Sequence, residues 1–442
     1  MSVFRIPEGA RRGGALLLLA TVTSVASASD RKFLSGYAGT IPPRDSDRAR
    51  TYFEKPAVRA LLGRLESGSV PSVEVDALLK GSGASVEDLQ RVGLLRRDED
   101  RFAIGFAYFT AEDMKAIYAV ADRAAADLAA AYRGRKREFD RILRGYPATG
   151  VPRDELAFVL LAGFSLNWDG LALTREMGLR RPRLVEGKDF RYSFWASEDV
   201  PGRDYREFYW GSSTYPLEGA GVAAPRAFSF SSFGDPESDP RMNFPDLAFL
   251  SAGELAPSVR SAAERVGLRD TEEMGEKFHG VLGGNVLRAA ADVLFALRKS
   301  PLPAGTIAGI TGNDPGPLLA LLEEIGYVAS DRKGLYRLTV PVLDDSDREM
   351  VEKLLATSRN VMRPWLESHA AGIRRELAGL TAIRAGLSFE EVFTQVWHEI
   401  FGATTRELVR DGVIASAYGR EARSKGSFSV LWRPRLYAFI PG

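Results

Sequence analysis

The 442-residue chain contains no cysteine. A chain without thiols cannot form a disulfide bond, a thiol nucleophile, an iron–sulfur cluster or a zinc site that needs cysteine ligands. Histidine is almost as scarce, because only His279, His369 and His398 occur. So few imidazoles cannot build a histidine-rich metal centre, although a carboxylate site for a hard cation stays open. We therefore expect neither a cofactor nor a metal centre.

An excess of charge of one sign is also lacking. Lys and Arg number 59 against 58 Asp and Glu, which gives a formal net charge of +1 at pH 7. No global field therefore attracts nucleic acid or an anionic membrane. The hydrophobic fraction of 45% and the charged fraction of 26% are ordinary for a globular protein. The length allows roughly two or three domains with cores of their own.

Recognisable catalytic motifs are the third absence. The chain has no G-x-S-x-G elbow, and the sequence after Trp397-His398-Glu399 lacks the second histidine of a zinc-protease helix. A serine-hydrolase site in 185–280 would have to bring together Ser212, Ser213, His279 and either Asp235 or Asp239. This hydrolase stays open as an alternative, but the sequence leans against an enzyme and identifies no catalytic residue.

The N-terminus has the order of a secretory signal. Several arginines precede the apolar run 15–22, and the small-residue site Ala26-Ser27-Ala28 follows it. This order is typical of a signal peptide that is cleaved on export. We predict a signal peptide at 1–28 and a periplasmic or extracellular protein, with a cytoplasmic protein as the alternative. The apolar run is too short for a membrane span, so we expect no stable span after cleavage.

The chain also contains the same pattern twice. Residues 93–110 of a first copy correspond to residues 326–343 of a second copy. Each is followed by an acidic helix start, with Thr110 as the expected cap in the first copy, and then by a helix of about thirty residues. We infer an internal duplication of the units 52–184 and 286–420.

Each copy predicts three short helices and then two strands that flank a polar turn. In the second copy the features are a leucine-rich third helix, the glycine exit Gly326-Tyr327, the turn Asp331-Arg332-Lys333-Gly334 and the strand end Leu338-Thr339-Val340-Pro341-Val342. With these features the second copy resembles winged helix-turn-helix domains of the ArsR and MarR type, and the first copy resembles them less closely. The resemblance implies an α+β, predominantly helical fold with two winged-helix units, each followed by a long helix. It also implies either a monomer with an internal pseudo-dimer or a homodimer.

The remaining segments complete the predicted domain plan. Residues 29–51 are polar and read as a linker. Residues 185–285 are rich in aromatic side chains, which predicts an aromatic-rich β insert between the two units. Residues 421–442 predict C-terminal strands, which we expect to pair with strands of the insert.

DNA binding is the usual role of a winged helix, because its third helix can enter the major groove. The third helix of the second copy, however, ends in Glu323-Glu324 and carries no Lys or Arg. Phosphate contacts need cations, and the chain places its cations on the wings and the tail. The residues of this DNA- or anion-binding surface would be Arg96, Arg97, Arg101, Arg332, Lys333, Arg420, Arg423, Lys425, Arg433 and Arg435. A cytoplasmic DNA-binding transcription regulator is therefore an alternative that the charges do not favour.

The aromatic insert offers the more distinctive surface. Large aromatic side chains with small polar neighbours suit protein or glycan contacts. The residues of this partner-binding surface would be Trp195, Tyr209, Trp210 and Tyr215. We therefore predict an exported, non-enzymatic binding or regulatory protein that uses tandem winged-helix units as an interaction scaffold. Its partner would be a protein or another extracellular ligand.

Overall fold

Helices predominate in the structure, which confirms the predicted α+β, predominantly helical class. The structure is a computed structural model that describes residues 31–40, 44–147, 150–188, 190–201, 211–214, 228–234, 244, 261–262, 264–265, 286–312, 314–415 and 427–432. The predicted signal peptide 1–28 lies outside the described residues.

The chain folds into two compact units, each built from separate stretches of sequence. Unit 1 comprises Met1–Arg123, Thr174–Arg203 and Leu366–Ile400, and unit 2 comprises Ala124–Leu173, Asp204–Trp365 and Phe401–Gly442. Because the boundaries fall inside helices, several helices contribute one end to each unit.

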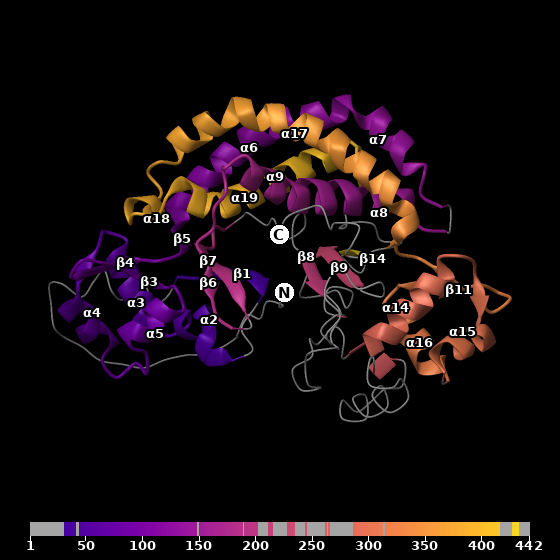
Figure 1. Cartoon of the computed structure of the whole chain (residues 1–442), viewed down its shortest axis with the longest axis horizontal. Helices are drawn as coiled ribbons and strands as arrows, with labels where there is room; N and C mark the ends of the chain where they lie inside the picture. Colours follow the sequence, from indigo (N-terminus) through magenta and orange to yellow (C-terminus); the bar gives the residue numbers. More distant parts are fainter. Residues whose placement is uncertain are drawn as a thin grey trace. The chain divides into compact units, whose positions relative to one another are not determined.

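Module 1, in unit 1, consists of three helices and a small antiparallel sheet (Figure 1). Its elements are α3 (Pro56–Leu65), β2 (Val70–Pro71), α4 (Ser72–Leu79), α5 (Val86–Arg91), β3 (Leu95–Asp98) and β4 (Arg101–Ile104). The sheet has the order β2-β4-β3. Pro56 stands in the first turn of α3, where a missing N–H costs nothing. Val58, Leu61, Leu62 and Leu65 recur at helix spacing and are all buried.

Module 2, in unit 2, repeats this series of elements. It comprises α14 (Val286–Leu297), β10 (Leu302–Pro303), α15 (Ala304–Thr311), α16 (Gly316–Glu324), β11 (Val328–Ser330) and β12 (Leu335–Leu338). Its sheet has the order β10-β12-β11, which matches module 1 strand for strand. The four leucines of α16 are buried in the core of the module.

The third helix of both modules ends in the same way. A glycine follows each helix in the left-handed conformation, Gly93 with φ 79° and Gly326 with φ 77°. The N–H of the next residue donates to the carbonyl five positions back, at 2.8 Å in module 1 and 2.7 Å in module 2. This is the glycine cap that the sequence predicts for the helix before Gly326. It turns the chain directly into the next strand, β3 in module 1 and β11 in module 2.

Each unit has a second sheet whose strands come from distant parts of the sequence. These strands are β1 (Phe33–Thr40), β5 (Ala107–Phe109), β6 (Val185–Glu186) and β7 (Arg191–Glu198) in unit 1, and β8 (Gly211–Thr214), β9 (Ser229–Gly234), β13 (Val342–Leu343) and β14 (Ser427–Trp432) in unit 2. In unit 1, β7 pairs antiparallel with β1 and parallel with β5. In unit 2, β14 pairs antiparallel with β9 and parallel with β13. The predicted pairing of the aromatic-rich segment with the C-terminal strand is confirmed for β9 and β14.

The segment 29–51 differs from the predicted linker. It contains β1, the short 3₁₀ turn η1 (Asp45–Asp47) and the start of α2 (Ala49–Phe53). The ring centroids of Tyr37 and Tyr192 are 5.1 Å apart, and those of Phe33 and Tyr108 are 5.6 Å apart. Because these partners lie far along the chain, the local composition gave no sign of the strand.

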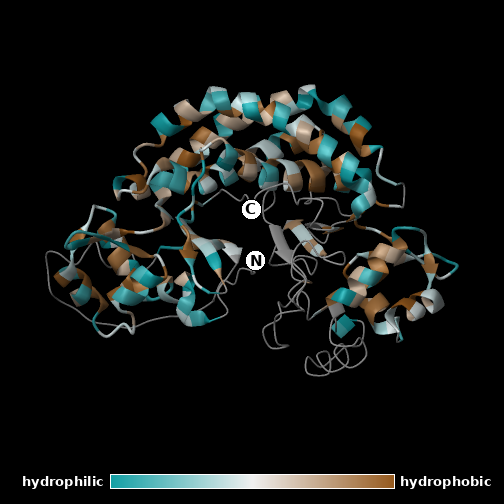
Figure 2. Ribbon diagram, viewed as in Figure 1, coloured by the Kyte–Doolittle hydropathy of each residue, from teal (hydrophilic) through white to brown (hydrophobic). Residues whose placement is uncertain are grey.

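The other helices follow the two modules. They are α6 (Ala111–Gly134), α7 (Lys136–Leu143), α8 (Arg153–Phe158), the π-helical η2 (Val159–Asp169) and α9 (Gly170–Glu176), and later the 3₁₀ turn η5 (Asp345–Asp347), α17 (Arg348–Glu376), α18 (Thr381–Arg384) and α19 (Phe389–Arg410). The predicted cap of α6 is confirmed, because the N–H of Asp113 donates to Thr110 Oγ1 at 3.2 Å. Figure 2 shows hydrophobic and hydrophilic residues alternating along α17, as expected of an amphipathic helix.

The helical stretch Arg153–Glu176 is the one long helix among the described residues with a strongly apolar window. By length and composition it could cross a membrane, but 89% of its apolar window is buried inside the protein. Its central π-helical turns contain Gly163, which lies against the ring of Phe233 from β9. These contacts are those of a core helix.

Candidate interaction surfaces

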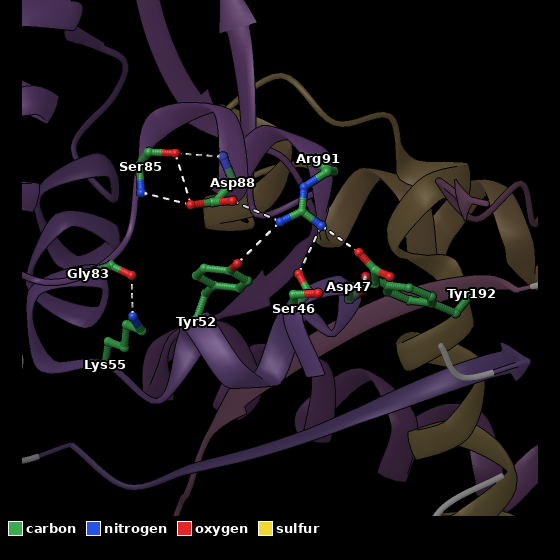
Figure 3. A network of polar contacts seen from close by, with 9 residues as sticks. All are labelled: Ser46, Asp47, Tyr52, Lys55, Gly83, Ser85, Asp88, Arg91 and Tyr192. Carbon is green, nitrogen blue, oxygen red and sulfur yellow. Dashed lines mark hydrogen bonds and ion pairs between the residues drawn. The ribbon is translucent and has the colours of Figure 1, made fainter. Parts of the chain in front are cut away.

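Arg91 is the only basic residue of α5, the third helix of module 1. Its guanidinium donates to Asp47 Oδ1 at 2.7 Å, to Asp88 Oδ1 at 2.8 Å, to the Ser46 carbonyl at 2.9 Å and to the Tyr52 hydroxyl at 3.2 Å (Figure 3). The hydrogen bond from Arg91 holds the pKa of Asp88 below its ordinary value. The charge of Arg91 is therefore already balanced inside the molecule.

Asp88 connects this cluster to the start of α5. Its Oδ2 accepts from the N–H of Ser85 at 3.3 Å and from the Ser85 hydroxyl at 2.9 Å, while its own N–H donates to Ser85 Oγ at 3.1 Å (Figure 3). This capping box fixes the N-terminal end of α5. The same carboxylate also bonds Arg91, the last residue of the helix. We call Ser46, Asp47, Tyr52, Asp88 and Arg91 the Arg91 cluster.

The third helix of module 2 is acidic at its exposed end. Glu323 Oε1 accepts from the N–H and the hydroxyl of Ser330, both at 2.8 Å. Glu324 pairs with Arg265 at 2.6 Å. Since α16 contains no Lys or Arg, it offers a phosphate group no cation.

Arg96, predicted to contact DNA or another anion, turns toward the protein instead. Its guanidinium donates to the carbonyl of Ala385, which caps the C-terminal end of α18. A helix C-terminus attracts a cation because its last carbonyls carry partial negative charge. Gly386 follows with φ +95°, and a Cβ there would collide with the Arg96 guanidinium. Arg96 is therefore a structural contact within unit 1.

The other predicted cations of module 1, on β3 and β4, also bond to nearby oxygens. Arg97 Nε donates to the carbonyl of Glu99 at 2.8 Å, and Arg101 Nε donates to Ser69 Oγ at 2.9 Å. Both side chains are exposed, so they retain donors that could face a partner.

The turn between β11 and β12 in module 2 differs. Asp331 Oδ1 accepts from the N–H groups of Lys333 at 2.8 Å and Leu335 at 3.0 Å, which fixes the turn. Arg332 and Lys333 are exposed, and neither side chain has a hydrogen-bond or ion-pair partner in the described part of the chain. Among the predicted cations that the structure describes, these two are the ones whose side chains make no hydrogen bond or ion pair.

Trp195, the described member of the predicted partner-binding surface, lies on β7. Its indole covers Gly36 of β1, where a Cβ would collide with the ring. Beside it, Arg183, Glu391 and Thr394 help to line a cavity of about 20 Å³. That volume holds about one water molecule, so this cavity is too small for a ligand.

Several predicted residues lie outside the described part of the chain. They are Tyr209, Trp210, Tyr215, Asp235, Asp239, His279, Arg420, Arg423, Lys425, Arg433 and Arg435. Ser212 and Ser213 lie on β8. The hydrolase alternative and the basic tail therefore stay predictions.

A buried hydroxyl cluster in unit 2 was not anticipated from the sequence. The hydroxyls of Tyr132, Ser165 and Ser358 bond to one another. Burial raises the pKa of Tyr132, so its hydroxyl stays protonated. A serine nucleophile needs a base, and neither serine bonds to one here. Next to this cluster in sequence, Asp169 accepts a forked ion pair from Arg359, with oxygen–nitrogen distances of 2.8–3.0 Å.

The surroundings of His398 also favour the neutral form of its side chain. Its Nδ1 lies 2.6 Å from the carbonyl of Thr394, one turn earlier in α19, and burial lowers the pKa of His398 to about 4.

Among the described residues, no group of three or more His, Cys, Asp or Glu side chains could hold a metal ion. No family model, curated protein or solved structure matches this chain.

Proposed function

We propose that this chain is a non-enzymatic binding protein that holds a protein partner through two winged-helix modules, one in each unit. The shared series of three helices and a three-stranded antiparallel sheet supports the winged-helix assignment. A third helix that serves DNA needs cations at its surface. The observation that carries the proposal is that the only cation on the two third helices, Arg91, is balanced by Asp47 and Asp88.

We also propose that the protein is exported and meets its partner outside the cytoplasm. The order of charges, apolar run and small-residue site in residues 1–28 supports this location. The competing function is a cytoplasmic DNA-binding regulator. Its support is the exposed pair Arg332 and Lys333 on the wing of module 2.

Titration of the chain with a labelled DNA duplex separates the two functions. We expect only weak binding, with a dissociation constant no tighter than the non-specific range of about 10⁻⁴–10⁻⁶ M at physiological salt. The double variant Arg332→Gln/Lys333→Gln should behave as the unmodified chain does. Sequence-selective binding that this double variant abolishes would replace the proposal with the DNA-binding one.

A photo-crosslinking side chain at Ala320 tests the protein-binding role directly. Ala320 is partly exposed on α16, and the matched control position is the exposed Lys353 on α17. We expect the Ala320 probe to capture one protein from the exported fraction and the Lys353 probe to capture none. Equal capture at both positions would argue against a partner seated on the third helix.

A further inference from the structure

A cavity of about 550 Å³ opens in unit 2 where α7, α8 and the end of α19 meet. Small-molecule sites usually have volumes of about 300–1,000 Å³. This cavity is therefore large enough for a small organic ligand, unlike the cavity of about 20 Å³ beside Trp195.

One wall of the cavity is apolar. Leu143 ends α7, Ala157 lies in α8, and Val413 and Ile414 follow α19. Gly412 adopts φ +65°, and the N–H of Val413 donates to the carbonyl of Leu408 at 2.9 Å. This glycine cap reverses the chain so that residues 413–415 line the cavity instead of continuing the helix.

The rim of the cavity carries two guanidinium groups. Arg144 caps the end of α7 and Arg153 begins α8. Both side chains are exposed, and within the described residues neither has a hydrogen-bond or ion-pair partner. An anion that entered the cavity could therefore pair with them without displacing a bond already made.

The carboxylates that line the same cavity are already engaged. Asp140 pairs with Lys136 at 3.0 Å. Asp154 Oδ1 accepts the N–H of Glu155 at 3.0 Å, at the start of α8. The lining therefore combines an apolar wall with two unengaged cations. These two features match the apolar body and the charged end of an amphipathic anion.

We propose that this cavity binds a small carboxylate with an apolar body. The carboxylate accepts a forked pair of hydrogen bonds from Arg144 or Arg153, a geometry that guanidinium groups favour. The hydrocarbon part lies against Leu143, Val413 and Ile414, where it is removed from water. This ligand site is separate from the third helices and does not depend on the proposed protein-binding role.

Calorimetric titration of the full chain with decanoate, decanol and inorganic phosphate tests the site. We expect decanoate to bind, and decanol and phosphate to bind at least about tenfold more weakly, because each lacks one of the two matching features. Decanol binding as tightly as decanoate would remove the role of the cations. Phosphate binding as tightly would remove the role of the apolar wall. Either result, or no decanoate binding at millimolar concentration, overturns the proposal.

Two variants place the binding at this cavity. Arg144→Gln/Arg153→Gln should weaken decanoate binding about tenfold, since exposed ion pairs each contribute only a few-fold. Arg137→Gln/Arg141→Gln is the matched control, because these exposed residues lie on the same helix α7 and do not line the cavity. Ala157→Leu should also weaken binding by filling part of the cavity. Equal affinity in the test and control pairs would show that decanoate binds elsewhere.

Discussion

At the scale of single residues, the Arg91 cluster shows how one cation can serve folding instead of recognition. The guanidinium joins α5 to the segment before α2 through Asp47 and the Ser46 carbonyl, and it also pairs with Asp88 of its own helix. Arg91→Met removes these bonds and should lower the free energy of unfolding by about 1 kcal/mol, because exposed pairs contribute little singly but several share this group. Urea unfolding measures the change. Arg64→Met, which breaks the single exposed pair with Glu74, is the control and should cost less than about 0.5 kcal/mol.

His398 predicts a pH dependence of stability. Burial lowers its pKa to about 4 in the folded chain, whereas an unfolded histidine titrates near pH 6.5. Between these values the unfolded chain binds a proton that the folded chain does not, so stability falls as the pH drops from about 6.5 to about 4. The contribution has a slope of up to about 1.4 kcal/mol per pH unit. His398→Gln should flatten the unfolding profile in this window, with His369→Gln as the matched control. A wild-type slope in His398→Gln would mean that another group causes the loss.

At the scale of elements, the end of α18 depends on a glycine that a residue of β3 covers. Gly386 has φ +95°, and the Arg96 guanidinium occupies the space of a Cβ. Gly386→Ala should cost about 1–3 kcal/mol, through backbone strain and the displaced bond to Ala385. Gly178→Ala is the control, because Gly178 has φ +72° but nothing within 4 Å of the added atom. Thermal or urea unfolding should rank Gly386→Ala as the more damaging, and equal costs would remove Arg96 from the explanation.

The sequence predicted the elements whose signals are local. Helix spacing, glycine exits and the Thr110 cap depend on residues within one or two turns, so the helices of both modules and the start of α6 could be predicted. Strand β1 could not, because its partner β7 lies far along the chain. Arg96 was expected to face an anion, but its acceptor Ala385 stands 289 positions away in sequence. The cavity beside Arg144 has the same origin, since helices far apart in sequence form it.

At the scale of the whole molecule, the proposed export requires that cleavage of the signal peptide leave the first strand of the fold intact. Cleavage after Ala28 would leave β1 intact, because β1 begins at Phe33. Mass spectrometry of fractionated cells should find a mature chain that starts near Ser29 in the exported fraction. An intact Met1 in the cytosol would return the cytoplasmic regulator as the favoured function.

The same boundary can be tested by stability. Removal of residues 1–28 should leave the free energy of unfolding within about 0.5 kcal/mol of that of the full chain, because β1 keeps its whole register with β7. Removal of residues 1–40 deletes Phe33 and Tyr37 and exposes the buried rings of Tyr192 and Phe194. It should cost more than about 3 kcal/mol, since each large side chain contributes about 1.5–3 kcal/mol when buried. If both truncated chains unfold at the same urea concentration, β1 contributes nothing to the stability of unit 1. The segment before Asp45 would then behave as a linker, despite the pairing of β1 with β7.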